Sequence, residues 1–358
     1  MKNSLQFKPE LLEEPVGASL EWIVQSIVAN EGQGSSAYYH LWKGWSESYP
    51  ETTGYLIETL FDASNISQLY PLQAIAFSCA NWLCSLQMPN GAFPGGVGGK
   101  LPPIVFDTGM ILFGLQRAYE ESRDQKYLAA LHLATNWLVS QQDDDGVWPN
   151  HAFVHDYIPS YYTMVIWAIL KANKQLKIRG IEQKLSASLD FFLQKITPQL
   201  TIRNWGFRPG EPAFTHTIAY TLQGMLESGI LLKRKEVTER VQTIADQILL
   251  IRQQKGKLAG EYDENWRGNY SFGCMTGQAQ MSILFFRLYE VSGNKVYLNE
   301  AQLLLLQMLQ FQSNVRLMGW YGGIPGSAPV WGKYQRFRFT NWGAKYFLGA
   351  CLLMRRHL

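Results

Sequence analysis

The stretch TGQAQMSILFF, residues 276–286, opens with a Thr-Gly pair and continues as an apolar run. Two other Thr-Gly pairs, at residues 53–54 and 108–109, also open apolar runs. Threonines in this position recur at intervals of 54 to 64 residues: Thr53, Thr108, Thr163, Thr217, Thr276 and Thr340. Thr is favourable at a helix start, because its hydroxyl can accept a hydrogen bond from a free N–H group of the first turn. Repetition at one period predicts a chain built from copies of one structural unit.

A second apolar run lies between successive threonines, so each unit is expected to be a pair of helices. In residues 72–83, LQAIAFSCANWL, the apolar residues have the i, i+3, i+4, i+7 spacing of a helix. The first helices are predicted near 19–30, 71–87, 124–142, 180–195, 234–254 and 294–312. The second helices are predicted near 53–64, 107–121, 160–175, 214–231, 271–291 and 340–354. No segment alternates cleanly enough to predict a strand.

Six helix pairs predict an all-α fold, an (α/α)6 toroid in which six inner helices are surrounded by six outer ones; a linear helical solenoid is the alternative. Inner helices should be apolar on almost every side, as residues 164–170 and 282–286 are. The chain has 47% hydrophobic and 17% charged residues, which suits such a core. Without a linker or a low-complexity stretch, residues 1–358 are predicted to form one domain.

Long segments join the first helix of each pair to the second, while the reverse connections are short. All six long segments should emerge on one side of the ring, and long loops are usually functional. They are residues 31–52, 88–106, 143–159, 196–213, 255–270 and 313–339. Seven of the twelve Trp residues lie in these loops. Such aromatic rings can plug the end of a toroid, or they can form flat apolar faces on which sugar rings stack.

Polar residues in the same loops are the candidates for catalysis. Asp107 and His216 directly precede a repeat threonine, and Glu51 lies two residues before one. A carboxylate at a helix N-terminus can also serve only as a cap or a partner of the helix dipole. The pair His155-Asp156 lies in the middle of a loop, where a histidine has less structural reason to occur.

Several classes of protein are not favoured by the sequence. The four Cys residues are too few and too scattered for a disulfide framework or a zinc site, so no metal is predicted. A net charge of +3 with mixed signs argues against a nucleic-acid partner, and no apolar run is long enough for membrane insertion. We find no signal peptide, P-loop or dinucleotide fingerprint, so we expect a cytoplasmic protein without a cofactor.

The helix-pair repeat with Trp- and Gly-containing loops resembles the six-hairpin glycosidase superfamily of hydrolases, polysaccharide lyases and sugar epimerases. Residues 44–55, 215–220 and 274–280 also resemble uncharacterised proteins of bacterial exopolysaccharide clusters, which implies a role in polysaccharide biosynthesis. Residues 136–148, NWLVSQQDDDGVW, look like the Gln-Trp repeat of terpenoid-cyclase and protein-prenyltransferase toroids. However, the Asp run here ends an outer helix, and no Asp, Cys and His set matches the zinc site of the prenyltransferases.

The favoured hypothesis is a carbohydrate-active enzyme that binds an oligosaccharide or polysaccharide in a central aromatic funnel. A hydrolase would use two carboxylates, for which we predict Asp107 and Asp156, with Glu264 or Glu211 as substitutes. A lyase or epimerase would remove a proton with His155, His216 or Tyr161. The sugar carboxylate would be neutralised by Arg203, Arg208, Arg267 or Arg338. The predicted substrate-binding residues are Trp45, Trp148, Tyr161, Trp205, Trp266, Trp320 and Arg338. The alternatives are a non-catalytic glycan-binding or assembly protein, and a terpenoid-cyclase- or prenyltransferase-like toroid.

Overall fold

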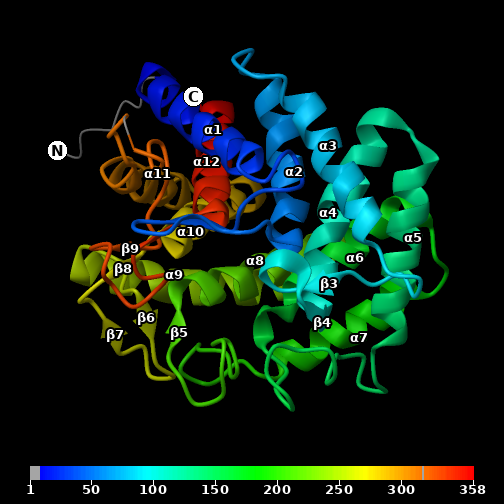
Figure 1. Cartoon of the computed structure of the whole chain (residues 1–358). Helices are drawn as coiled ribbons and strands as arrows, with labels where there is room; N and C mark the ends of the chain where they lie inside the picture. Colours follow the sequence, from blue (N-terminus) through cyan, green and yellow to red (C-terminus); the bar gives the residue numbers. More distant parts are fainter. Residues whose placement is uncertain (1–8, 317) are drawn as a thin grey trace.

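The computed structural model describes residues 9–316 and 318–358, which form six helical hairpins arranged in a ring (Figure 1). The outer helices are α1 (Glu13–Val28), α3 (Leu72–Leu86), α5 (Gln125–Ser140), α7 (Ile181–Leu193), α9 (Lys235–Lys255) and α11 (Lys295–Leu309). The inner helices are α2 (Pro50–Ser64), α4 (Val105–Ser122), α6 (Thr163–Leu176), α8 (Thr215–Leu231), α10 (Met275–Ser292) and α12 (Asn341–Arg356). The predicted hairpins are therefore confirmed, although α1 begins six residues earlier than predicted.

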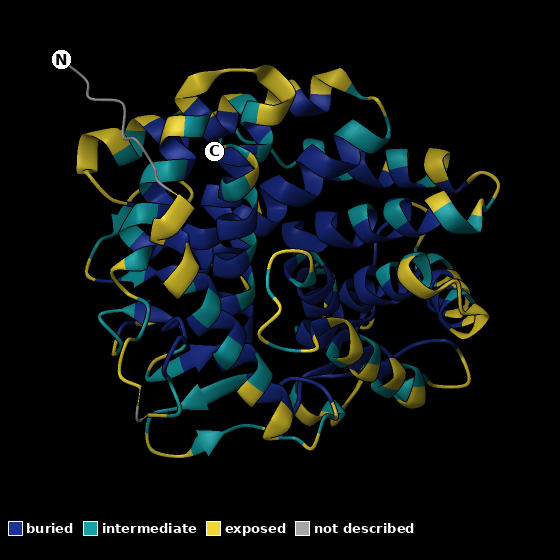
Figure 2. Cartoon of the chain, turned by 90° about the horizontal axis from the view of Figure 1, so that it is seen from above, coloured by how far each residue is buried: buried dark blue, intermediate teal, exposed yellow. Residues whose placement is uncertain are grey.

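The inner helices form a closed ring. Each contacts the next, from α2 through α4, α6, α8 and α10 to α12, and α12 returns to contact α2. This last contact confirms the (α/α)6 toroid and excludes the linear solenoid, in which the first and last hairpins would not meet. The inner helices are buried on almost every side, whereas the outer helices expose one face to solvent (Figure 2).

Short strands, which the sequence did not predict, connect the long loops to one another. The first long loop, residues 31–52, and the last, residues 313–339, share the sheet β10–β1–β2. Its strands are β1 (Tyr38–His40), β2 (Gly44–Trp45) and β10 (Arg338–Thr340). The other strands are β3 (Pro94–Gly95), β4 (Leu101–Pro103), β5 (Ala213–Phe214), β6 (Glu261–Tyr262), β7 (Gly268–Asn269), β8 (Gly273–Cys274) and β9 (Ser327–Ala328). At two or three residues each, they are too short to show the alternation that identifies a strand in a sequence. β3 and β4 pair within the 88–106 loop, whereas the other three sheets join the last three long loops and the first one. These four loops therefore form one layer at one end of the ring.

Most of the repeat threonines do not cap their helices, as the sequence had predicted they would. Only Thr340 caps its helix, where its hydroxyl accepts from the N–H of Gly343. Thr53 and Thr108 lie inside the first turn, and their hydroxyls accept from the loop N–H groups of Ser35 and Phe93. These two threonines therefore attach their loops to α2 and α4. Thr163 instead donates to the carbonyl of Thr221 on α8, and Thr217 donates to the carbonyl of Phe214, so the repeat threonines do not share one contact.

A Gln…Gly pattern in the loops also has a structural cause. Gln87 donates from Nε2 to the carbonyl of Gly91 in its own loop and to the carbonyl of Ala130 on the next outer helix. Gln142 and Gln312 make the same kind of double contact with a loop glycine and a neighbouring outer helix. The pattern that resembles the Gln-Trp repeat of terpenoid cyclases thus fastens one hairpin to the next.

Glycine sets the spacing of the inner helices, and this gives a test of the packing. A Cβ atom at Gly54 would lie 2.5 Å from the Cα atom of Ile111 on α4. We therefore expect Gly54→Ala to lower the free energy of unfolding by about 1–3 kcal/mol, measured by urea denaturation. Gly349→Ala on α12 is the matched control, because its Cβ would approach only the Cδ1 atom of Ile283, at 3.5 Å. Equal stabilities of the two variants would contradict the close packing.

Candidate active site

A cavity of about 370 Å³ opens in the loop layer, at the N-terminal ends of the inner helices. Its walls come from α2, α4, α8 and α12 and from four of the long loops. The lining residues are Tyr49, Glu51, Tyr55, Phe106, Phe153, Val154, Tyr161, Phe207, Arg208, His216, Tyr220, Tyr334, Gln335 and Trp342. The cavity is thus largely aromatic, with one carboxyl group, one imidazole and one guanidinium.

Two matched pairs of side chains face each other across this cavity. Glu51 and Tyr55 are one helical turn apart on α2, and His216 and Tyr220 are one turn apart on α8. In a closed ring of six inner helices, α2 and α8 lie on opposite sides. The hydroxyl of Tyr220 donates to the hydroxyl of Tyr55 over 3.4 Å. The two tyrosine side chains therefore meet at the centre of the toroid.

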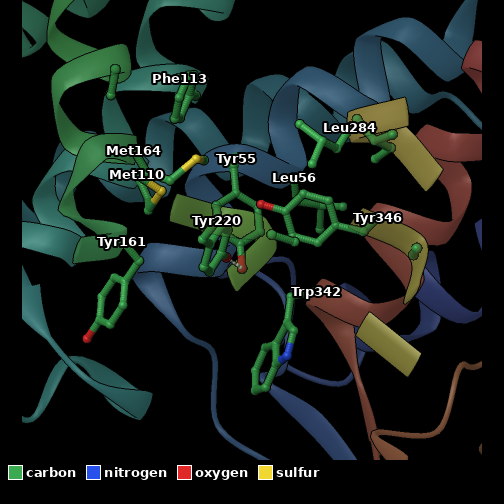
Figure 3. Close-up of a cluster of buried hydrophobic side chains, with 14 of the residues drawn as sticks. Tyr55, Leu56, Met110, Phe113, Tyr161, Met164, Tyr220, Leu284, Trp342 and Tyr346 are labelled. Atoms are coloured by element: carbon green, nitrogen blue, oxygen red, sulfur yellow. Dashed lines mark hydrogen bonds between the residues drawn. The ribbon is translucent and has the colours of Figure 1, made fainter. Parts of the chain in front are cut away.

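The tyrosines close the floor of the cavity. Tyr346 packs against both of them, with ring centroids 5.7 Å from Tyr55 and 5.9 Å from Tyr220 (Figure 3). Residues on one helix face repeat every three to four positions, and Glu51 and His216 precede the tyrosines by four. Glu51 and His216 therefore stand one turn above the floor, on opposite walls.

Glu51 is a buried acid. Burial raises the pKa of its carboxyl well above the usual value, and the negative charge of Asp107 raises it further. The hydroxyl groups of Tyr49 and Tyr55 stabilise the carboxylate and offset part of this rise. Glu51 consequently keeps its proton to higher pH than an ordinary glutamate, as a general acid must.

Asp107 lies behind the cavity wall rather than in it. Its side chain is fully buried, and Oδ2 accepts a hydrogen bond from the N–H of Gly96 over 2.8 Å. The other oxygen, Oδ1, has no hydrogen-bond partner among the described residues. Burial raises the pKa of Asp107 to about 7, although the Gly96 N–H and the Tyr49 hydroxyl oppose the rise. Asp107 is therefore placed to influence Glu51, not to contact a ligand.

The raised pKa of Asp107 predicts a dependence of stability on pH. The folded protein holds this proton up to about pH 7, while the unfolded chain releases it near pH 4. The contribution is therefore fully present below about pH 4 and is lost as the pH rises to about 7, at about 1.4 kcal/mol per pKa unit. Asparagine resembles the protonated acid and can still accept from Gly96, so Asp107→Asn should be more stable than wild type at pH 8.

Urea denaturation at pH 5 and pH 8 measures this effect. The free energy of unfolding should fall between these values by less in Asp107→Asn than in wild type. Asp144→Asn, on an exposed loop, is the control and should follow wild type. A pH dependence of Asp107→Asn that parallels wild type would contradict the assigned protonation.

His216 is a buried, neutral base. Its Nδ1 atom lies 2.6 Å from the Oε1 atom of Gln280, so the ring donates its Nδ1 proton to this carbonyl. Burial lowers the pKa of His216 to about 4, although the hydrogen bond to Gln280 opposes the change. The neutral ring then carries its lone pair on Nε2 and can accept a proton there. Tyr220 and Tyr334 hold the ring, with centroids at 4.4 Å and 5.5 Å.

The other predicted catalytic residues do not reach this cavity. The side chains of His155 and Asp156 are 91% and 86% exposed, and they pair with each other at 2.7 Å. Glu211 and Glu264 line a second depression of about 320 Å³, formed mainly by the 196–213 and 255–270 loops, which shares Arg208 with the cavity. The predicted convergence of Asp107 with Asp156 is therefore not found. The 143–159 loop directs the side chains of His155 and Asp156 into solvent.

Most of the predicted stacking residues have packing roles. Trp148 is fully buried and donates from Nε1 to the carbonyl of Leu138, so no sugar can reach its face. Trp45 and Trp320 pack against Tyr39, Trp205 packs against Trp266 at 5.2 Å, and Arg338 lies over Tyr38 at 4.3 Å. Of the predicted substrate-binding set, only Tyr161 lines the cavity.

Several lining residues were not predicted from the sequence, and one signal could have found them. Glu51 was identified at the mouth but not proposed as catalytic, and Tyr55, Tyr220 and Trp342 were not identified. Glu51/Tyr55 and His216/Tyr220 are the second and sixth residues of their inner helices, so an i, i+4 pairing of a titratable residue with a tyrosine is the signal. Because the two pairs are offset by one residue relative to the repeat threonines, the threonine register alone does not align them.

No group of three His, Cys, Asp or Glu side chains among the described residues could hold a metal ion. None of their helices combines the length and apolar character needed to span a membrane.

Comparisons with known proteins support the fold. No protein-family model matches the chain, and no curated protein matches its sequence. Among solved structures, it is similar to an unsaturated glucuronyl hydrolase specific for heparin, with a TM-score of 0.78, 14% identity and 98% of each chain covered. A cellobiose 2-epimerase from Bacillus thermoamylovorans B4167 gives a TM-score of 0.76 at 12% identity, with 98% of each chain covered. An α-amylase from Clostridium perfringens gives a TM-score of 0.69 at 14% identity, with 95% of this chain and 97% of the α-amylase covered. These neighbours share the six-hairpin toroid.

Proposed function

We propose that the protein is a glycoside hydrolase, with Glu51 as the general acid and a sugar bound between Glu51 and His216. The observation that carries this proposal is the placement of a raised-pKa carboxyl and a neutral imidazole on opposite walls of one aromatic cavity. The volume of about 370 Å³ lies in the range of small-ligand sites. The similar solved structures are sugar-processing enzymes by name, which supports a sugar as the ligand.

The chemistry follows from the protonation states. Glu51 gives its proton to the glycosidic oxygen as the bond to the leaving sugar breaks. A water molecule attacks the anomeric carbon from the opposite side, and its proton passes to Nε2 of His216. Gln280 fixes the Nδ1–H tautomer, so Nε2 is the atom that faces the reaction. Burial keeps the pKa of Glu51 raised and so keeps the acid protonated, and the charge that Asp107 gains above about pH 7 raises this pKa further.

A second candidate reaction is epimerisation or β-elimination on a uronic sugar. The placement of Glu51 and His216 on opposite walls suits this reaction as well, because one of them can remove a proton from carbon while the other serves as the acid. Arg208 lines the cavity and could pair with a sugar carboxylate. A conjugate-acid pKa of about 4 makes His216 a weak base for a C–H proton, so hydrolysis is favoured.

Proton NMR in D₂O distinguishes these reactions when the purified protein is mixed with neutral and uronate oligosaccharides. Hydrolysis gives new reducing-end anomeric signals, and this is the expected result. A vinylic signal would indicate elimination, and exchange of a ring proton for deuterium without cleavage would indicate epimerisation. Binding of farnesyl diphosphate but of no sugar, seen as a rise in melting temperature, would overturn the proposal in favour of a terpenoid-like toroid.

A further inference from the structure

Two loops bring exposed aromatic and basic side chains together beside the cavity. Residues 38–46, YYHLWKGWS, form the β1–β2 hairpin, and residues 331–338, WGKYQRFR, lead into β10. The N–H of Leu41 donates to the carbonyl of Phe337 over 3.1 Å, and the rings of Trp42 and Phe337 lie 4.7 Å apart. The N–H of Phe337 in turn donates to the carbonyl of Val330 over 2.8 Å, which brings the residue before Trp331 next to Phe337. We call the apolar and basic side chains of these two joined segments the rim patch: Trp42, Lys43, Trp331, Arg336, Phe337 and Arg338.

The tryptophans of the rim patch are unusual in this protein. Among the described residues, Trp42 and Trp331 are the only exposed tryptophans, at 71% and 62%. Exposing these large apolar side chains leaves their surface in contact with water, and a ligand that covers them would relieve this cost. Phe337 supports Trp42 from below, so the indole ring is held in place without being covered.

The rim patch is also positively charged. Neither segment contains Asp or Glu. Lys333 in the same segment pairs with Glu261 at 2.7 Å, whereas Lys43, Arg336 and Arg338 have no carboxylate within 4.0 Å in residues 9–316 and 318–358. Slight burial and the positive charges of Arg338 and Lys43 lower the pKa of the neighbouring His40.

The rim patch is continuous with the cavity through a single loop. Tyr334 and Gln335 line the cavity wall. Arg336, which directly follows Gln335, and Trp331, three residues before Tyr334, belong to the patch. Arg338 donates from Nη1 to Oε1 of Gln335 over 3.0 Å, which ties the patch to the wall. A ligand chain that leaves the cavity over Gln335 therefore meets the patch next.

We propose that the rim patch binds an acidic polysaccharide whose end occupies the cavity. Trp42 and Trp331 stack on sugar rings outside the cavity, and Lys43 and Arg336 pair with carboxylate or sulfate groups of the chain. This inference rests on the proposed function, since it takes the cavity ligand to be a sugar. It adds that the substrate is a long, anionic chain rather than a short, neutral oligosaccharide.

Affinity electrophoresis tests this proposal without requiring turnover. Native gels would contain hyaluronan, polygalacturonate or heparin, with dextran as the neutral polymer. Wild type should be retarded by at least one acidic polymer and not by dextran, and the retardation should weaken with added salt. The loss of two anchoring residues should raise the dissociation constant about 10-fold or more in each double variant, Trp42→Ala/Trp331→Ala and Lys43→Ala/Arg336→Ala.

The control removes the same charges elsewhere. Lys174, in the last turn of α6, and Arg179, just after this helix, are exposed at the opposite end of the ring, so Lys174→Ala/Arg179→Ala should be retarded like wild type. Melting temperatures near the wild-type value show that each variant is folded. Glu51→Gln should also be retarded like wild type, so a failure of the catalytic proposal is distinguishable from a failure of this one.

Three outcomes would overturn the proposal. They are no retardation of wild type by any acidic polymer, equal retardation of wild type and both rim variants, and retardation by dextran as strong as by the acidic polymers. Vesicles containing phosphatidylglycerol give a further arm: if the rim variants lose binding to these vesicles and not to the polymers, the patch binds an anionic membrane surface instead.

Discussion

Replacing Glu51 with glutamine is expected to slow turnover about 10²- to 10⁴-fold while leaving sugar binding nearly unchanged. Glutamine has nearly the same shape as the protonated acid but cannot release a proton to the leaving oxygen. The buried site already favours an uncharged side chain, because burial and Asp107 raise the pKa of Glu51. The variant should therefore fold normally, and the loss should fall on kcat rather than on KM.

Glu47→Gln is the matched control for this prediction. Glu47 lies in the loop before α2 and pairs with Lys100 at 2.6 Å in an exposed position, so the same substitution there should leave kcat within about twofold. The wild-type pH profile offers a second check: since the acid must be protonated, kcat/KM should fall as the pH rises through the raised pKa of Glu51. Full activity of Glu51→Gln would exclude Glu51 as the acid.

Replacing His216 with alanine is expected to abolish turnover and to preserve sugar binding. The substitution removes the Nε2 atom that accepts the proton, and it leaves Glu51 and the tyrosine floor in place. Because the pKa of His216 is lowered to about 4, the wild-type ring is neutral and active above this pH and protonated below it. The acidic limb of the wild-type profile should therefore lie near pH 4, and activity should decline below it.

His132→Ala is the control for His216→Ala. His132 is exposed on the outer helix α5, and its substitution should leave both kcat and the melting temperature close to wild type. Turnover and isothermal titration of a bound oligosaccharide measure the two halves of the prediction. Unchanged turnover in His216→Ala would remove this residue from the mechanism, and lost binding would assign it to substrate recognition.

The fold could be predicted because the same helix-pair pattern occurs six times in the sequence. Each hairpin repeats the period of its neighbours, and the apolar inner helices are distinct from the amphipathic outer ones. The helix contacts then follow from the need to bury the apolar faces. The loop strands could not be predicted, since two or three residues pair only because the ring has already placed the loops beside each other.

The candidate site was most predictable where its residues belong to an inner helix, although Arg208 of the 196–213 loop was also among the candidates and lines the cavity. His216 was identified because it directly precedes a repeat threonine, so its place at the top of an inner helix follows from the repeat. His155 and Asp156 lie in the middle of a long loop, where spacing along the chain gives no information on direction. Trp148 shows the other difficulty: a tryptophan in a loop can turn inward and pack, and composition does not distinguish this from an exposed ring.

Proton NMR of wild type and Glu51→Gln, each mixed with the same oligosaccharide, tests the central claim most directly. The oligosaccharide is the one that raises the melting temperature of the wild-type protein most in a panel of neutral and uronate sugars. The proposed acid–base site predicts that wild type converts it to products, while Glu51→Gln binds it and leaves its spectrum unchanged. A spectrum that stays unchanged with bound wild-type protein would contradict the proposal and identify a glycan-binding protein without catalysis.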